Sequence, residues 1–185
     1  MDLCAKLVAA NVSLLDQCKS FLVDIPADVY TDATQPPFPF SIGAQVRHNL
    51  DMYACLIRDY EKKSIDFTNR ERNSTIEVCP DLAIKHTERL QNDLKRFSSE
   101  NEARHLGVLV EPATGTFLEI PMMLGGILGF LYYHTMHHHA TIAVLSCGLN
   151  HTLRDGSFGY NPTTLRYIEG LQAVDAIQSG SYQNE

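Results

Sequence analysis

Three segments of the chain repeat hydrophobic residues at the spacing of an α-helix. The first covers residues 3–23, the second opens at Ser41 and runs to residue 64, and the third begins near Cys79 with Pro80 at its first position. Their inner stripes are Leu3, Leu7, Ala10, Leu14, Cys18 and Phe21; Ile42, Val46, Tyr53, Leu56 and Tyr60; and Ala83, Thr87, Leu90, Leu94 and Phe97. The pattern predicts three amphipathic helices.

The connecting segments follow other patterns. Residues 26–40 contain Pro36, Pro37 and Pro39 and predict a loop without helix, and the polar stretch TNRERNST predicts a turn before the third helix. In residues 105–120, β-branched runs flank a Pro–Gly turn, which predicts a short β-hairpin. A fourth helix is predicted over residues 121–148, and Asn161-Pro162 starts a C-terminal piece.

Four long helices and one hairpin predict an all-α fold, a four-helix bundle with a short β-hairpin inserted between the third and fourth helices. A length of 185 residues, with 44% hydrophobic and 20% charged residues, is typical of one globular domain spanning residues 1–185. The core of such a bundle is a place where facing helices can build a metal site.

Charge and composition exclude several other classes of protein. The net charge of −7 argues against a nucleic-acid partner, because phosphate binding needs basic residues. The apolar run at 121–133 is too short to span a membrane, the N-terminus has no secretory pattern, and five cysteines form no C-x-x-C motif. We therefore expect a cytoplasmic protein with neither a membrane nor a nucleic-acid partner.

Histidines are concentrated in one apolar segment, LYYHTMHHHATIAVL, at residues 131–145. His134 and His138 are one helical turn apart and share a stripe with Ile127, Leu131, Ile142 and Leu145. Two inward imidazoles at this spacing can bind one divalent metal, although a buried histidine can equally be a core residue with a hydrogen-bond partner. His137 flanks the same face and can reach the rim of the site, whereas His139 lies outside it.

A third ligand can be sought among the other histidines. The candidate is His48 in QVRHNLDMY, because it follows the predicted cap of the second helix and precedes an apolar stripe. His86 lies in a polar run typical of a surface, and His105 and His151 fall in predicted loops. Since metals bind neutral imidazole, the site is expected to weaken below about pH 6.

Four segments resemble the DinB/YfiT-like superfamily: SIGAQVRHNLDMY, NRERNSTIEV, HTMHHHATI and FGYNPTTLRY. The resemblance implies a four-helix bundle in up-down-down-up order, often a homodimer, with a divalent metal held by His48, His134 and His138. The chain departs from many relatives at Gln45 and Met52, where they carry histidines. Both changes alter the surroundings of the pocket without touching the three implied ligands.

Three histidines leave at least one coordination position of a metal open to water or substrate. We expect zinc or nickel, although iron also tolerates imidazole. Asp51, one turn after His48, is a candidate for orienting the site, or else a surface acid of the helix. Arg47 is a candidate for meeting an anionic substrate, or else a solvated or ion-paired residue.

The sequence leaves two functions open. The first is a metal-dependent transferase or hydrolase acting on a small molecule, with a low-molecular-weight thiol as a candidate cosubstrate, because characterised members of the family include thiol-dependent transferases and isomerases. The alternative is a non-catalytic metal-binding module in a stress response or an interaction. The first predicts an accessible coordination position, and the second predicts a closed site.

Overall fold

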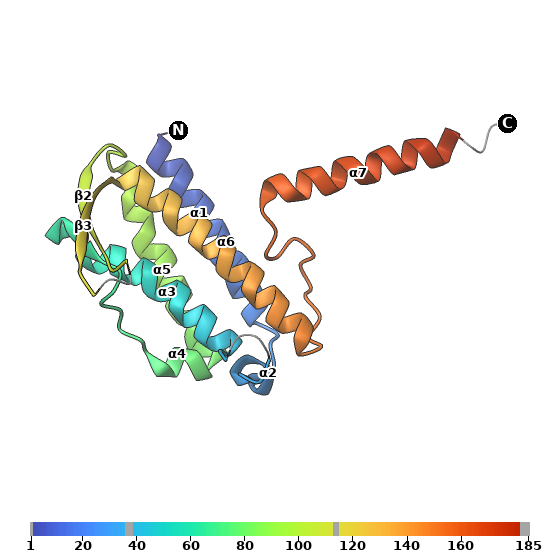
Figure 1. The fold of residues 1–185 in the computed structure, drawn as a ribbon, viewed down its shortest axis with the longest axis horizontal. Coiled ribbons are helices and arrows are strands. Elements are labelled where there is room, and N and C mark those ends of the chain that lie inside the picture. Colours follow the sequence, from blue (N-terminus) through green and yellow to red (C-terminus); the bar gives the residue numbers. More distant parts are fainter. Residues whose placement is uncertain (1, 36–38, 113–114, 182–185) are drawn as a thin grey trace.

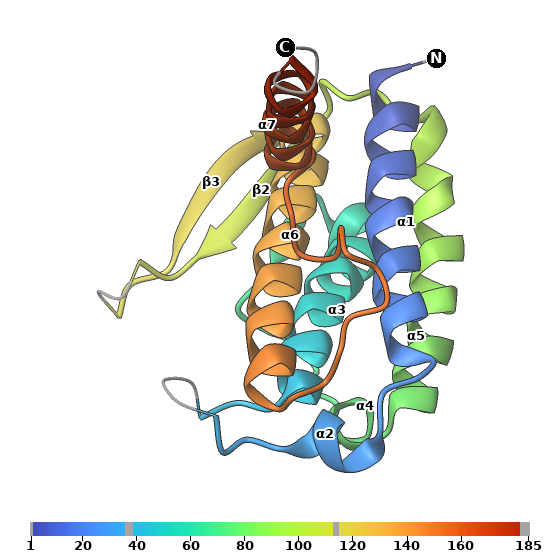
Figure 2. The same cartoon turned by 90° about the vertical axis from the view of Figure 1, so that its right-hand side faces the viewer.

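The computed structural model describes residues 2–35, 39–112 and 115–181, and its main body is a bundle of four long helices (Figure 1). These are α1 (Leu3–Leu22), α3 (Ile42–Asp59), α5 (Pro80–Leu94) and α6 (Leu124–Gly148). Helix α1 packs against α5 and α6, and α3 packs against the same two helices. In Figure 2, α1 and α6 begin at one end of the bundle, whereas α3 and α5 begin at the other.

The helix starts follow the signals in the sequence. The Ser41 hydroxyl accepts a hydrogen bond from the Ala44 amide at 3.0 Å, and Pro80 occupies the first turn of α5, where no amide hydrogen is needed. The predicted N-terminal signals of both helices are confirmed. The segments predicted as loop and turn also contain short helices, α2 (Ala27–Thr31) and α4 (Ser74–Val78). Two 3₁₀ turns extend the longer helices, η1 (Tyr60–Lys62) after α3 and η2 (Lys95–Ser99) after α5.

A small sheet lies beside α3 and α6. The predicted hairpin is formed by β2 (His105–Val110) and β3 (Leu118–Met123), and part of its turn, residues 113–114, lies outside the described residues, as do residues 36–38 of the proline-rich segment. A third strand, β1 (Ser64–Asp66), pairs in parallel with β2. The fold is therefore mostly helical with a three-stranded sheet, where the sequence predicted an all-α fold with a two-stranded hairpin. The sequence misses β1 because its partner lies about forty residues away and leaves no local signal. Residues 121–123 belong to β3, so α6 starts three residues later than predicted.

A buried polar network fixes α6 against α1 and α3. The Tyr53 hydroxyl lies 2.8 Å from Asn11 Oδ1 and 2.6 Å from the Thr135 hydroxyl, which lies 3.0 Å from Asn49 Oδ1. These side chains are 1% exposed or less, and hydrogen bonds away from water specify one arrangement of the packed helices. Because Thr135 neighbours His134 in sequence, the network sets the height of the histidine-rich turn of α6 against α3.

The chain beyond α6 first folds back on the bundle and then leaves it. Phe158 is 2% exposed, and Gly159 lies so close to α6 that a Cβ atom there would meet the Ala140 Cα and the His139 oxygen at 3.0 Å. Gly159 also has φ of +83°, a conformation that favours glycine. The final helix, α7 (Pro162–Ser181), extends away from the bundle (Figure 1).

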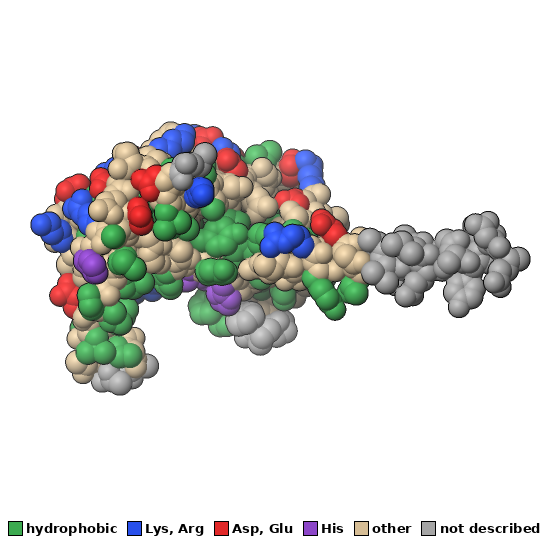
Figure 3. Space-filling model, turned by 90° about the horizontal axis from the view of Figure 1, so that it is seen from above, with side chains coloured by type: hydrophobic (Ala, Val, Ile, Leu, Met, Phe, Trp, Pro, Cys, Tyr) green, Lys and Arg blue, Asp and Glu red, His purple; other side chains and the backbone are tan. Residues whose placement is uncertain are grey.

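The surface carries charged side chains of both signs. On the face seen in Figure 3 they gather mainly along one edge, and hydrophobic side chains form a group near the middle of the face. Over the residues that the structure describes, every helix is too short or too polar to cross a membrane.

Candidate metal centre

Three histidines from two helices meet between α3 and α6. His48 comes from α3, His134 and His138 come from consecutive turns of α6, and one ring nitrogen from each lies within 4.8 Å of the others. The ring centroids are 5.2 Å apart for His48 and His134, 4.6 Å for His48 and His138, and 4.5 Å for His134 and His138. The three predicted ligands are therefore brought together, with His138 buried and the other two partly exposed.

The three rings differ in their polar contacts. His138 Nδ1 lies 2.8 Å from Gln45 Oε1, and because a carbonyl oxygen only accepts, Nδ1 carries the proton and Nε2 is free as a ligand. His48 Nδ1 lies 2.6 Å from Arg70 Nη1. His134 Nε2 is buried and has no hydrogen-bond partner.

The histidines are held in their neutral form. Burial in the first place, and neighbouring positive charge in the second, lower the pKa of His48 and of His134 to about 4 and that of His138 to about 3. For His48 the next cause after burial is the Arg70 guanidinium, and for His138 it is His134. Protons therefore compete with a metal nearer pH 4 than the pH 6 expected from an unperturbed imidazole.

This donor set fits a divalent metal ion. Neutral imidazole nitrogens suit zinc and nickel, and His134 Nε2 has no other acceptor or donor to satisfy it. Two nitrogens on a tetrahedral zinc ion lie about 3.4 Å apart, so ring nitrogens that lie within 4.8 Å of one another need to approach by up to about 1.4 Å.

Arg47 and Asp51 lie beside the cluster and bind each other. Arg47 Nη1 donates to Asp51 Oδ2 at 2.9 Å, and Arg47 Nε donates to Glu77 Oε2 at the same distance. The Asp51 side chain is 4% exposed, so it is not a surface acid. It forms its ion pair with Arg47 rather than with His48. Arg47 was a candidate either for meeting an anionic substrate or for an ion pair. In the structure it is ion-paired, and its bond to Glu77 connects α3 to α4.

The remaining histidines fall outside the cluster. His137 is exposed, with its ring centroid 5.2 Å from that of His138, so it flanks the site without joining it. His139 is fully buried on another side of α6 and stacks on Phe158. His86 is half-buried rather than on the surface, with Nδ1 2.9 Å from Arg89 Nη2, and His105 begins strand β2 instead of lying in a loop. His151 lies in the loop after α6, as predicted.

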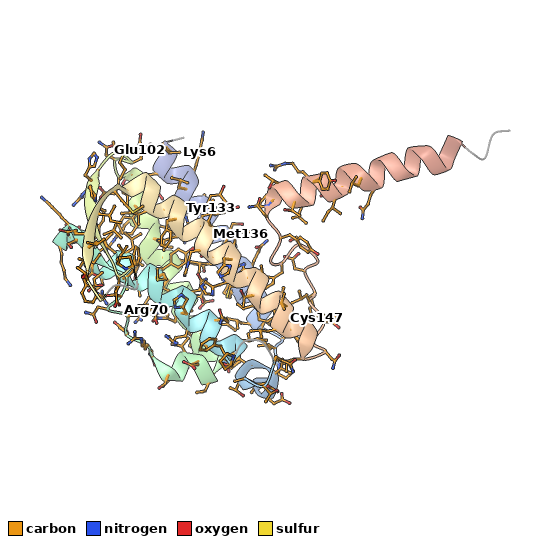
Figure 4. All side chains as sticks on the ribbon, in the orientation of Figure 1. Lys6, Arg70, Glu102, Tyr133, Met136 and Cys147 are labelled. Atoms are coloured by element: carbon orange, nitrogen blue, oxygen red, sulfur yellow. The ribbon has the colours of Figure 1, made fainter. Side chains whose placement is uncertain are left out.

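Two residues at the site had no assigned role in the sequence. The first is Gln45, which stood out only as a replacement for a histidine, yet its Oε1 is the hydrogen-bond partner of His138. Met52, the other replacement, is buried in the hydrophobic core. Arg70 lies in the loop after β1, beside α3 (Figure 4). It lies 22 residues from His48 along the chain and carries no helical periodicity, so only the folded structure reveals the contact.

A separate cavity of about 140 Å³ lies on the α1 side of the bundle. It is lined by Phe21, Asp24 and neighbouring residues of α1 and by residues 151–155 and Phe158. None of the three clustered histidines lines it, so it is not the entrance to the metal centre.

One solved structure supports the expected fold. The crystal structure of a DinB-like protein from Bacillus subtilis, YjoA, aligns with a TM-score of 0.54 and 18% sequence identity, covering 80% of this chain and 93% of that chain. At this identity the likeness shows the fold alone, and the predicted DinB-like fold is confirmed. No protein-family model and no curated protein matches the chain.

Proposed function

We propose that the chain binds one divalent metal ion, zinc or nickel, through His48, His134 and His138, and uses it to act on a small-molecule substrate. The observation that carries the proposal is the meeting of three neutral imidazoles from two helices, one of them with a buried nitrogen that has no partner. Leaving such a nitrogen unsatisfied costs about 1–3 kcal/mol, and a metal ion removes that cost.

A metal on three imidazoles keeps a coordination position for water or substrate and supplies Lewis acidity there. The protein's own side chains set the geometry around it. Gln45 fixes the orientation and tautomer of His138, and the Thr135 network fixes the height of α6 against α3. His48 and His134 are partly exposed, which is compatible with access of a small molecule to the cluster. A metal-dependent transferase or hydrolase, with a low-molecular-weight thiol as a candidate cosubstrate, fits this arrangement.

The first test is the metal content of protein purified without an affinity resin, measured by elemental analysis. We expect about one divalent ion per chain in the wild type and loss of the ion in His48→Ala and in His134→Ala. His137→Ala is the matched control, because it removes an exposed imidazole from the same turn of α6 and should keep the ion. Wild-type protein without metal, or ligand variants that retain it, would refute the assignment.

A metal-binding module without turnover is the second candidate. It is favoured by the position of the 140 Å³ cavity, which none of the three histidines lines. Cobalt-substituted protein separates the candidates, because the visible spectrum of cobalt responds to a new ligand. A spectrum that shifts on addition of a small thiol supports an open, reactive site. A spectrum that changes with neither thiols nor small anions supports a metal-binding module without turnover.

A further inference from the structure

Arg70 is a cation at the metal centre with no anion of its own. Its Nη1 donates to His48 Nδ1 at 2.6 Å, and its Nε is buried without an acceptor. Among the ion pairs of the described residues none includes Arg70, since the nearby carboxylate of Asp51 is bound to Arg47. A partly buried charge in this state is unfavourable unless a partner arrives.

The loop that carries Arg70 is held firmly in place. Asp66 Oδ1 accepts hydrogen bonds from the amides of Thr68 and Asn69, and the Asn69 carbonyl accepts from Arg58 Nη1 at 2.7 Å. Arg58 is in turn paired with the buried carboxylate of Asp59 on α3. The backbone next to Arg70 is therefore tied to α3.

The hydrogen bond between Arg70 and His48 is incompatible with a metal on His48. A neutral imidazole has one protonated and one free nitrogen, and a guanidinium can only donate. If the metal takes Nδ1, that nitrogen is no longer available to Arg70. If the metal takes Nε2, Nδ1 carries the proton and cannot accept. In both cases metal binding would release the Arg70 guanidinium from His48, next to the histidine cluster.

We infer that Arg70 selects an anionic substrate, a small molecule with a carboxylate group, for the open position of the metal. This inference rests on the proposed metal site. At the cluster Arg70 Nε has no acceptor and Nη1 is released, and each of them forms with Nη2 a planar pair of donors that matches the two oxygens of a carboxylate. Arg47 does not take this role, because its positive charge is already paired with the carboxylates of Asp51 and Glu77.

The test uses the cobalt-loaded full-length protein and acetate as the probe, with acetamide as its neutral analogue, and follows the visible spectrum of cobalt. Arg70→Gln should weaken acetate binding about tenfold or more, because it removes a charge-assisted hydrogen bond. Arg72→Gln is the matched control, since it removes an exposed arginine from the same loop, and should change acetate affinity less than about twofold. Acetamide should bind the wild type and Arg70→Gln alike.

Cobalt affinity gives a second readout with the opposite sign. Arg70→Gln frees His48 Nδ1 and removes a nearby positive charge, so it should bind cobalt at least as tightly as the wild type. Arg70→Lys keeps the charge without the paired donors, so its acetate affinity should fall between the two, and it replaces Arg70→Gln if that variant does not fold. Equal acetate affinity in the wild type and Arg70→Gln, with cobalt bound by both, would overturn the inference and leave the metal site standing. A wild type that binds no cobalt would overturn the proposed function itself.

Discussion

His138 and His139 are adjacent in the sequence and both are buried, yet they face different surroundings on α6. His138 meets two other imidazoles and has Gln45 as a polar partner. His139 stacks on Phe158, with ring centroids 4.5 Å apart, and neither of its ring nitrogens has a hydrogen-bond partner. Burial lowers the pKa of His139 to about 4, much as it does for the three histidines of the cluster.

The difference teaches that burial and a lowered pKa do not by themselves mark a metal ligand. Both sides of α6 hold neutral histidines, but only the α3 side has donors that converge from a second helix. The other side is closed by residues 151–160, where Phe158 stacks between Phe21 and His139. One side has the geometry of a binding site, and the other has the geometry of a core.

Of the changes that test the difference between the two sides of α6, Phe158→Ala should have the largest effect on stability. Phe158 is 2% exposed, and truncating a buried phenylalanine lowers the free energy of unfolding by about 3–5 kcal/mol. Urea denaturation measures the loss, and Tyr160→Ala, an exposed aromatic of the same segment, should change stability by less than about 0.5 kcal/mol. Metal content should stay unchanged. Loss of the ion in Phe158→Ala would show that the two sides of α6 are coupled rather than independent.

Acid should destabilise the metal-free protein through both sides of α6. The pKa values of His48, His134 and His139 are about 4 in the folded state, against 6.5 for an unperturbed histidine, so the unfolded chain binds more protons between these values. The contribution of these neutral histidines to the free energy of unfolding should be fully present above pH 6.5. It should fall as the pH drops toward 4, by at most about 1.4 kcal/mol per pH unit for one fully buried histidine. Denaturation at several pH values with a chelator measures the slope. A flat profile between pH 7 and 4.5 would contradict the burial of these rings.

Much of the cluster was predictable from sequence because its parts obey local rules. His134 and His138 interrupt an apolar stripe at helical spacing, so helix periodicity places both on an inner face, and His48 is indicated because it follows the Ser41 cap and precedes an apolar stripe. Strand β1 and Arg70 escaped prediction for one shared reason. Each depends on a partner distant in the chain, Ser64 on Gly107 and Arg70 on His48, and no local pattern encodes such a contact.

The burial of His139 shows the same limit on the other side. The sequence predicted that His139 lies outside the metal site, but it did not predict that Phe158 stacks on the ring. Gly159, with its positive φ, allows this segment to lie against α6. A segment that folds back after a turn leaves no periodic signal. The sequence therefore identified the side of α6 that carries the histidine cluster and could not identify what closes the opposite side.

Gln45 sharpens the comparison, because it is the polar partner that His138 has and His139 lacks. Gln45→Ala removes the acceptor for His138 Nδ1 and should weaken metal binding about 10- to 100-fold, the usual loss when such a partner is removed. Gln45→Glu keeps an acceptor at this place and should preserve most of the affinity. Competition with a chromophoric chelator measures both variants. Equal affinity in the wild type and Gln45→Ala would mean that the packing of α6 alone orients His138.

The smallest expected effect belongs to His139→Phe. The substitution removes two buried nitrogens without partners and keeps an aromatic ring against Phe158, so the loss of an unfavourable desolvation offsets the cost of fitting a larger ring. We expect the free energy of unfolding to change by less than about 1 kcal/mol at pH 7, and its decline toward pH 4 to become shallower. Metal content should stay at the wild-type level, whereas His138→Phe should abolish it. A His139→Phe protein that lost its metal would give His139 a part in the site, and the division between the two sides of α6 would no longer hold.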